Sequence, residues 1–501
     1  MKQLSISSNK KIVIAVMLLS LLSSSIALSV ETYLNDTISE DIEQSNNNNI
    51  QPNDKSKNAN IDMKIVYGYQ YNNVLSTINL SQEGEDFVYL LSSHFKRSND
   101  FGYNGRKYTN SSFNENRIGF TGNSNILERM KLTFDAVVDS DSRGMFNNPV
   151  YSREEKDKFE LSIKNIYEYS TSSEWYLSLG GAGYVHRLKA IEFDDRKSKL
   201  NQFNFDTGSE YIWSAHNRIR FGIGGFLYNY SVRYIDNDRY LDFEIIDDIN
   251  VSSNFGISIG LGYDWNKDED PLLFPFPIIG FSLKGYKHIS SFILYRYDIV
   301  PFKPEEFYLG QKYIKPSYDL PPGRVHHGDI RLEYRMNSRL NLKGNLEIEK
   351  NNNFYNYATV NGNVLSADTI SVIHYNTRID TNLILYKKIL ELAFGFEYSY
   401  FDADKNITYI ANRKFSNTIK YNGKKWKLEW TNKYIGRVDT DPDEDNKLEE
   451  AMIGYFGIQR QVHDGFYAYA RIENLYNNKY NLREDYPEPG FQLLGGLRIL
   501  I

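Results

Sequence analysis

The feature that most constrains the fold of this chain is an alternation of apolar and polar residues that recurs from Ile61 to the last residue. Near the end, for example, Phe466 and Ala468 alternate with Tyr467 and Tyr469. A period of two over roughly ten residues is typical of a strand with one apolar and one polar face. The repetition of this pattern over most of the chain predicts an all-β fold.

The alternating segments give about 22 strands, and single-chain bacterial outer-membrane barrels have an even strand number. The predicted strands span 61–70, 74–81, 86–97, 112–122, 128–138, 157–170, 174–186, 198–213, 216–232, 238–251, 255–265, 275–286, 289–298, 325–336, 340–351, 371–386, 389–402, 411–421, 425–437, 450–462, 466–477 and 491–501.

The connections between these strands alternate between short and long. Short turns such as Ser172-Ser173 and His463-Asp464-Gly465 follow even strands, and most long ones follow odd strands. The long connections are 98–111, 139–156, 187–197, 299–324, 352–370, 438–449 and 478–490. Outer-membrane barrels have short periplasmic turns and long outside loops. The sequence therefore predicts a transmembrane antiparallel up-and-down β-barrel in which the last strand pairs with the first.

Composition agrees with a membrane barrel. The 501 residues include 40 Tyr and 29 Phe, although only 41% of residues are hydrophobic. Only alternate residues of a barrel strand face lipid, and aromatic girdles mark both interfaces. A soluble sandwich also alternates, but one of this size would divide into domains, and no linker follows residue 60. The net charge of -6 gives no reason to expect nucleic acid as a partner.

The N-terminus predicts export. Lys10 and Lys11 precede an apolar run, and Ala27-Leu28-Ser29 resembles a cleavage site, so we expect a signal peptide over 1–29. Residues 30–60 are polar and lack a periodic apolar pattern, which predicts a disordered periplasmic tail. The barrel is expected over 61–501. The absence of cysteine fits an envelope protein that needs no disulfide.

Several motifs resemble the barrel of TonB-dependent outer-membrane receptors. They are Glu473-Asn474-Leu475-Tyr476, Lys479-Tyr480, Tyr486 and Pro489-Gly490 before the last strand, the segment from Tyr295 to Tyr308, and the opening from Tyr67 to Tyr103. The resemblance spans 61–501. It implies uptake of a bulky solute such as an iron chelate, cobalamin or a glycan across the bacterial outer membrane.

The sequence also departs from that family. About 30 polar residues separate the predicted cleavage site from the first strand, too few for the family's plug domain, and no TonB box is found. Phe491 and Ile501 replace the usual arginine and terminal aromatic residue. Two modes of transport stay open, a wide pore limited by its loops and a barrel plugged by another chain. Alternative functions are a structural or adhesive surface barrel and a general diffusion porin.

Two groups of residues are candidates for binding the solute. The connection 299–324 is rich in aromatic residues and proline, and we expect it either to fold over or into the mouth or to cover the surface. Alternation places mixed charges in the lumen, where ion pairs across the lumen or contacts to a plug are expected. The candidates are Phe302, Phe307, Tyr308, Tyr313, Tyr318, Arg331, Glu333, Arg335, Lys343, Glu347, Lys427 and Glu429.

No set of residues predicts an enzyme, a cofactor or a metal site. His326 and His327 are adjacent in a predicted strand and point to opposite faces, so they would not chelate one ion together. The acidic run from Asp439 to Asp445 is interpreted as a solvated outside loop rather than a calcium site. Outer-membrane lipid and lipopolysaccharide are the expected surroundings, and acidic outer loops would favour either cationic solutes or divalent bridging to lipopolysaccharide.

Overall fold

The computed structural model describes residues 59–68, 73–84, 87–103, 106–192, 195–214, 217–230, 239–266, 275–286, 288–300, 313–314, 320–336, 339–360, 364–385, 389–483 and 486–501. The predicted signal peptide lies outside these ranges, as does the predicted tail except for its last two residues, so both stay predictions.

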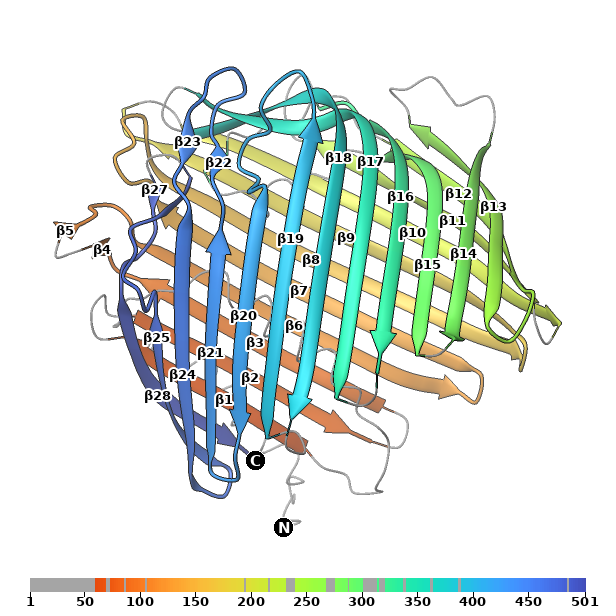
Figure 1. The fold of residues 1–501 in the computed structure, drawn as a ribbon, viewed down its shortest axis with the longest axis horizontal. Coiled ribbons are helices and arrows are strands. Elements are labelled where there is room, and N and C mark those ends of the chain that lie inside the picture. The colour runs from red at the N-terminus through yellow and green to blue at the C-terminus, as the bar shows by residue number, and fades with distance from the viewer. Residues whose placement is uncertain are drawn as a thin grey trace, which may run out of the picture.

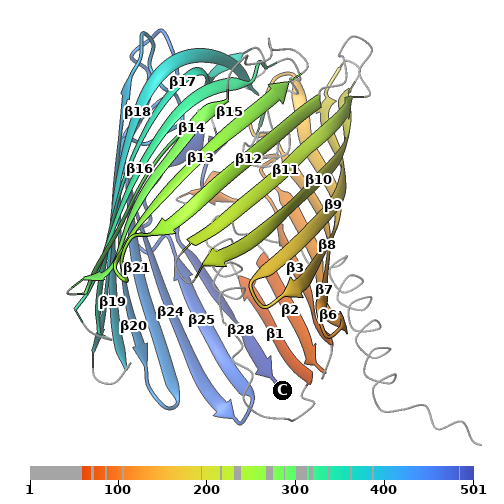
Figure 2. The same ribbon diagram turned by 90° about the vertical axis from the view of Figure 1, so that its right-hand side faces the viewer.

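The described chain forms a closed antiparallel barrel of 22 strands, in which each strand pairs with the next in sequence (Figures 1 and 2). The first eleven are β1 (Ala59–Gly68), β2 (Asn73–Glu83), β3 (Phe87–Ser98), β6 (Phe113–Leu127), β7 (Met130–Gly144), β8 (Tyr151–Ser170), β9 (Ser173–Ala190), β10 (Arg196–Ser214), β11 (Asn217–Tyr230), β12 (Arg239–Asn250) and β13 (Phe255–Asn266). The others are β14 (Phe276–Tyr286), β15 (Ile289–Val300), β16 (Gly323–Arg335), β17 (Leu340–Val360), β18 (Val364–Leu385), β19 (Leu390–Asp402), β20 (Arg413–Asn422), β21 (Trp426–Ile435), β24 (Ala451–His463), β25 (Phe466–Glu473) and β28 (Gln492–Leu500).

In the described part of the chain, three short hairpins lie within the connections between barrel strands. They are β4 (Gly102–Tyr103) with β5 (Arg106–Lys107), β22 (Val438–Asp439) with β23 (Lys447–Leu448), and β26 (Asn481–Arg483) with β27 (Tyr486–Pro487). The acidic run from Asp439 to Asp445 therefore lies mostly at the tip of the β22–β23 hairpin, where carboxylates are exposed.

The first and last strands close the barrel, as the sequence predicts. Ile65 lies opposite Leu497, and the backbone groups of Ile61 and Ile501 exchange two hydrogen bonds of 2.8 and 2.9 Å. Arg498 adds an ion pair of 2.7 Å to Asp62 across the same seam. Closure leaves the main sheet without a free edge, as a structure in lipid requires.

The Asn-Leu-Tyr motif has a structural explanation at this closing hairpin. Asn474 and Asn477 adopt left-handed backbone conformations, which asparagine tolerates better than most residues. The Asn474 amide donates to the carbonyls of Asn478 and Pro489, and the Asn477 side chain accepts from the Phe491 backbone N–H at 2.9 Å. The motif thereby fixes the long connection between β25 and β28.

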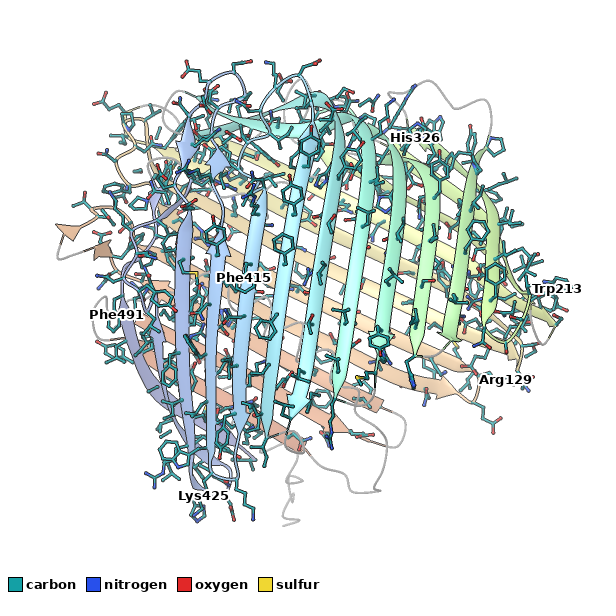
Figure 3. All side chains as sticks on the ribbon, viewed as in Figure 1. Arg129, Trp213, His326, Phe415, Lys425 and Phe491 are labelled. Atoms are coloured by element: carbon teal, nitrogen blue, oxygen red, sulfur yellow. The ribbon has the colours of Figure 1, made fainter. Side chains whose placement is uncertain are left out.

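The outer face carries exposed apolar side chains, among them Phe415 (Figure 3), and the residues that line the interior are mostly polar. In neighbouring strands the outward side chains include Ile163, Leu179, Phe203, Phe221, Phe243, Ile259, Ile279, Ile293, Ile330, Phe394 and Phe415. A continuous apolar band of this kind is the lipid-facing surface of a transmembrane barrel. Within the described residues, no helix is long and apolar enough to cross a membrane.

Three predicted loops are mostly strand. The region 187–197 is one of them, since β9 continues to Ala190 and β10 begins at Arg196. The region 139–156 is mostly strand, because β7 continues to Gly144 and β8 begins at Tyr151. The region 352–370 is also mostly strand, since β17 continues to Val360 and β18 begins at Val364. The polar residues in these regions still pair through their backbones, and a pattern based on apolar alternation does not detect such a continuation.

Candidate functional site in the lumen and at its mouth

The lumen holds a polar cavity of about 900 Å³ between the first and the last strands of the chain. Alternation turns one face of each barrel strand inward. The cavity is lined by side chains from β1, β2, β3, β6, β7, β8, β18, β19, β20, β21, β24, β25 and β28. Its charged lining residues are Asp62, Lys64, Arg117, Asp135, Glu160, Glu391, Lys420, Glu429, Lys433, Arg471 and Arg498. A cavity with this lining is suited to water and to polar solutes.

The charges around this cavity are balanced over short distances. Lys420 lies 3.8 Å from Glu429, and both side chains are partly exposed. Arg471 lies 2.8 Å from Glu473, deeper in the wall. The lumen therefore has no ring of a single sign at this level, and ion selectivity by such a ring is not built into these residues.

A second cavity of about 610 Å³ lies along the strands β10 to β15. Arg218 and Arg220 both contact Asp248, each at 2.9 Å. This second cavity extends the polar interior along the inner wall of the barrel.

The outer mouth is crossed by the extended hairpin of β17 and β18. The two strands rise in the wall, and a register shift between Asn351 and Phe354 marks a bulge. Bulges bend strands and increase their twist. Beyond the bulge, Phe354–Val360 pairs with Val364–Ile370, and this part, which we call the mouth hairpin, lies across the top of the barrel (Figure 1).

The tip of the mouth hairpin packs against the far wall. Val364 joins Met145, Tyr151, Leu188 and Tyr486 in one buried apolar cluster. Tyr151 and Leu188 belong to β8 and β9, and Met145 directly follows β7; these strands are separated from β18 by nearly half of the 22-strand ring. The contact therefore bridges the mouth rather than joining neighbouring strands.

The base of the mouth hairpin is held by the connection between β19 and β20. Tyr357 donates its backbone N–H to the Thr408 hydroxyl at 2.9 Å, and the Asn356 amide donates to the Asn406 carbonyl at 2.8 Å. Buried polar groups that are satisfied in this way are costly to separate, because each then loses its partner.

Two described residues of the connection between β15 and β16 also lie in the mouth. Ile314 is fully buried and forms a parallel bridge with Leu365 of the mouth hairpin. The backbone N–H groups of Tyr313 and Ile314 donate to the Glu154 carboxylate at 2.8 and 3.2 Å. The Tyr313 ring stacks on Tyr486 with centroids 3.8 Å apart, and burial raises the pKa of its hydroxyl.

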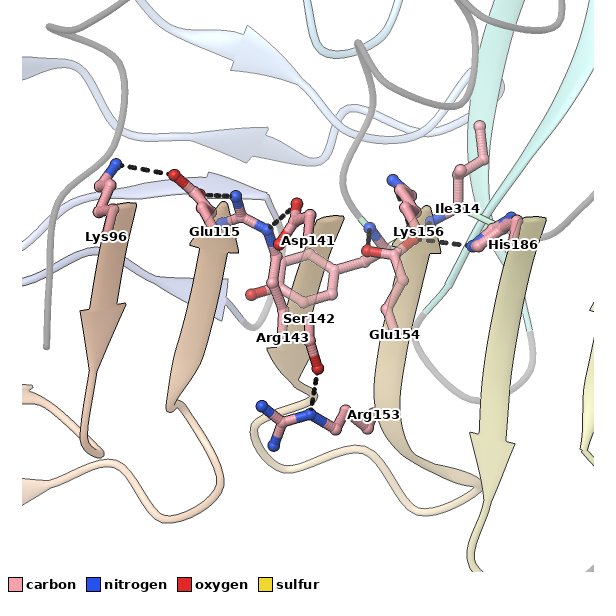
Figure 4. Close-up of polar contacts among 11 residues, drawn as sticks. Lys96, Glu115, Asp141, Ser142, Arg143, Arg153, Glu154, Lys156, His186 and Ile314 are labelled. Atoms are coloured by element: carbon pink, nitrogen blue, oxygen red, sulfur yellow. Dashed lines mark hydrogen bonds and ion pairs between the residues drawn. The ribbon is translucent and has the colours of Figure 1, made fainter. Parts of the chain in front are cut away.

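Glu154 belongs to a row of buried and partly buried charges on the inner face of the adjacent strands β3, β6, β7, β8 and β9 (Figure 4). It contacts Lys156 and His186, each at 3.1 Å, and all three side chains are almost fully buried. Farther along the row, Lys96 lies 3.1 Å from Glu115, which also contacts Arg143. The row forms a wall of paired charges on which the segment at 313–314 rests.

The predicted aromatic residues of the connection 299–324 are placed only in part. Tyr313 lies in the mouth, buried against the far wall, in agreement with a segment that folds into the mouth. Phe302, Phe307, Tyr308 and Tyr318 fall outside the described residues, so their roles stay predictions.

The predicted luminal charges lie on the inner face, because the residues beside them, such as Leu332 and Trp430, are exposed on the outer face. Of the set, only Glu429 lines the large cavity. Ion pairs across the lumen were expected for these charges. For the charges whose ion-pair partners the structure shows, this expectation is wrong, because each partner lies on the same strand or on the adjacent one. These contacts are Arg331 with Asp329, Arg335 and Lys343 with Glu333, Glu347 with His327, and Glu429 with Lys420; Lys427 also lies on this face of β21.

Sequence reasoning missed the mouth hairpin and the row around Glu154. The hairpin was hidden because Asn352, Asn353 and Asn356 resemble a loop sequence. The alternation of Glu154, Lys156 and Lys158 with outward residues continues the strand pattern of β8, and this alternation of charged residues was the available signal.

Comparison with known proteins shows which solved structures have a similar fold. The sequence matches no profile of a known protein family and no curated relative. Solved structures match well: the copper transporter OprC superposes with a TM-score of 0.69 at 9% identity, over 89% of this chain and 80% of that one. The FrpB iron transporter from Neisseria meningitidis gives 0.69 at 10% identity, over 89% and 82%.

A third match is the siderophore receptor PirA from Acinetobacter baumannii, with a TM-score of 0.68 at 9% identity over 89% of this chain and 81% of that one. The chain has the barrel fold of TonB-dependent receptors. The resemblance read from the closing hairpin is thereby confirmed at the level of the fold.

Proposed function

We propose that this protein is a transport barrel of the bacterial outer membrane that passes a bulky polar solute through its lumen. The observation that carries the proposal is the polar cavity of about 900 Å³ inside a closed 22-strand barrel. Barrels of 8 strands are filled by their own side chains, whereas barrels of about 22 strands enclose a wide lumen. An adhesive surface barrel has no need of such a lumen.

The mouth hairpin is the gate in this proposal. It bridges opposite walls through Val364 and covers the lumen from outside. A solute can enter only when this contact opens, so the open state must be stabilised by contacts to the solute. Loops and hairpins that close a lumen in this way distinguish a selective transporter from a general diffusion porin.

Two observations support the proposed class of solute: the similarity to solved transporters, and the chemistry of the residues that line the lumen. The structures similar to this barrel are titled as copper and iron transporters and siderophore receptors. Metal chelates, cobalamin and glycans are all polar and bulky, and they fit a lumen lined by balanced charges, hydroxyls and tyrosines such as Tyr455 and Tyr469. A plug contributed by another chain is compatible with this lining.

The proposal is tested by transport into proteoliposomes that contain the purified full chain. Labelled ferric chelates, cobalamin and oligosaccharides are compared with a small sugar, and protein-free vesicles are the control. The expected result is saturable entry of one bulky class with slow entry of the small sugar.

Other outcomes identify other functions. Fast, unsaturable entry of every small solute would make the protein a general diffusion porin. No entry of any solute, combined with specific adhesion of the vesicles to a surface, would favour an adhesive barrel. Either result would overturn the proposal of selective transport.

A further inference from the structure

The inner wall of the barrel is apolar over one stretch of the second cavity, on strands β12 to β15 (Figure 2). Ile246, Ile278, Phe292 and Leu294 line this cavity of about 610 Å³. Phe292 lies opposite Arg331, which belongs to the inner face. The interior of a wide transmembrane barrel is usually polar, so a group of apolar side chains there indicates contact with something apolar.

Small residues form a floor between these apolar side chains. Gly256, Ser258 and Gly260 of β13 pair with Ser282, Gly280 and Ile278 of β14, and all lie on the inner face. The apolar side chains of β12 stand on one side of this floor and those of β15 on the other. We call the four apolar side chains and this floor the apolar groove.

The apolar groove follows the direction of β14. The buried side chain of Ile278 closes one end, and the exposed side chain of Lys284 lies at the other end, near the turn to β15. Six residue steps separate the two, which correspond to about 20 Å at about 3.3 Å per residue. A groove that is long and narrow fits an extended hydrocarbon chain.

The arginines around the apolar groove are already paired with carboxylates. The charged residues that line the second cavity are Glu210, Arg218, Arg220, Glu244, Asp248, Lys284 and Arg296. Arg218 lies 2.9 Å from Asp248 and 3.4 Å from Glu210, and Arg296 lies 2.5 Å from Asp298. These three carboxylates are therefore neutralised by the protein itself.

Lys284 and Glu244 differ in their position relative to the groove. Within the part of the chain that the structure describes, no carboxylate lies within ion-pair distance of the Lys284 ammonium group. The Glu244 side chain lies over Gly222 of β11, where an added Cβ would be 3.3 Å from its Cγ, and so it points away from the floor on β13 and β14. The charge at the open end of the groove is thus a cation, which suits an anionic head group.

We propose that the apolar groove binds a single-chain anionic amphiphile, the chemical class of fatty acids. Its hydrocarbon chain lies along Phe292 and Leu294, and its carboxylate contacts Lys284. A fatty acid combines one linear chain with one carboxylate, as the groove requires, whereas a phospholipid carries two chains. This binding goes beyond the proposed transport of a polar solute and does not depend on it.

The test is photolabelling of the full-length protein in nanodiscs of neutral lipid. The probe is a palmitate analogue that carries a diazirine on its chain, and mass spectrometry of proteolytic peptides locates the label. We expect the label on inward residues such as Ser282 and Leu294. Unlabelled palmitate should compete, whereas hexadecanol, which lacks the carboxylate, should compete poorly.

Variants with matched controls separate the two parts of the site. Lys284→Gln should weaken labelling about two- to fivefold, because an exposed charge pair contributes modestly. Leu294→Gln should weaken it at least about tenfold through the lost apolar contact, and Ser282→Phe, which fills the floor, should abolish it. The controls are Lys424→Gln, in an exposed turn at the same end of the barrel, and Leu90→Gln, on the inner face of the other wall, and both should be labelled like the wild type.

Three results would contradict the proposal. They are a label confined to lipid-facing residues such as Ile293 and Tyr295, equal competition by palmitate and hexadecanol, and equal labelling of the wild type and the Ser282→Phe variant. Heat-modifiable migration on gels verifies that each variant folds, and the competition result needs no variant. Solute entry into proteoliposomes is measured separately, so failure here is distinguishable from failure of the transport proposal.

Discussion

The mouth and the lumen of this barrel are built from the same alternating strands but are packed in opposite ways. At the mouth, Val364, Leu188 and Ile314 are excluded from water, and the charges of Glu154 and Lys156 are buried and paired. In the lumen, the pair of Lys420 and Glu429 is partly exposed and borders a cavity of about 900 Å³. The lumen is polar and open to water, whereas the mouth is bridged by buried contacts.

If the barrel transports a solute as proposed, this difference places the control of transport at the mouth. A buried apolar contact across the mouth can be made or broken as a unit, whereas the wetted charges of the lumen respond gradually to solutes. Interactions that keep the mouth shut should therefore have large effects on conductance and stability, and luminal charges should have small ones. The following changes test that ordering.

Removal of the mouth hairpin should have the largest effect. Replacing Phe354–Ile370 by a short Gly-Asn-Gly turn leaves the wall strands intact and takes away the bridge to the far wall. Because a 22-strand barrel is wide, we expect a steady conductance at least about tenfold above that of the intact protein in planar bilayers. Lys424→Gln combined with Lys425→Gln, in the turn between β20 and β21 at the other end of the barrel, is the control and should leave conductance unchanged.

Loss of the Glu154 carboxylate should have the next largest effect, on stability. Glu154→Ala leaves Lys156 buried without its closest anion and frees the N–H groups of Tyr313 and Ile314. Breaking a buried pair from one side costs about 3–5 kcal/mol of unfolding free energy. Urea unfolding in detergent measures the loss, and adding Lys156→Met should restore part of it.

A luminal charge should matter far less. Glu429→Gln removes the partner of Lys420 at 3.8 Å, in a pair exposed to water within the cavity. Such pairs contribute about 0–1 kcal/mol. The same urea titration should therefore resolve little change, and a loss as large as that of Glu154→Ala would remove the distinction between mouth and lumen.

An exposed pair in the outer loop should have the smallest effect. Lys447 contacts Asp445 at 2.6 Å, and this hydrogen bond lowers the pKa of the Asp445 carboxyl. Any stabilisation is present above the usual pKa of aspartate and is lost as the pH falls through the lowered one. Both groups face water, so Asp445→Asn should leave the unfolding midpoint unchanged at neutral pH; a measurable shift would mean that this loop packs against the mouth.

The strand number, the parity of the turns and the pairing of the first strand with the last could be predicted from alternation, because each depends on local patterns. Even the closing motif at Asn474 was detectable as a sequence signature. The mouth hairpin was not, since Asn352 and Asn353 look like loop residues and only the bulge reveals that the ladder continues. The buried cluster that contains Val364 and Leu188 joins residues far apart in the chain, which no local pattern specifies.

The candidate site likewise has features that a local sequence pattern predicts and contacts that it does not. Inward orientation of Arg331, Glu333 and Lys343 was predictable from the period of two, but their partners were not. Charged side chains on the same strand or on adjacent strands lie close together, whereas opposite walls of a wide lumen are far apart. The charges therefore form ion pairs along the wall rather than across the lumen. The buried role of Glu154 depends on the segment at 313–314, which reaches it from a distant part of the sequence.

The central claim is that the mouth hairpin gates the lumen, and a reversible crosslink tests it most directly. The chain has no cysteine, so Val364→Cys and Leu188→Cys introduce a unique pair within one buried cluster. Single-channel recording is made on the oxidised protein and again after reduction, with each single variant as control. The account predicts a silent channel when oxidised and openings after reduction; equal conductance in both states, with the crosslink verified by gel mobility, would contradict it.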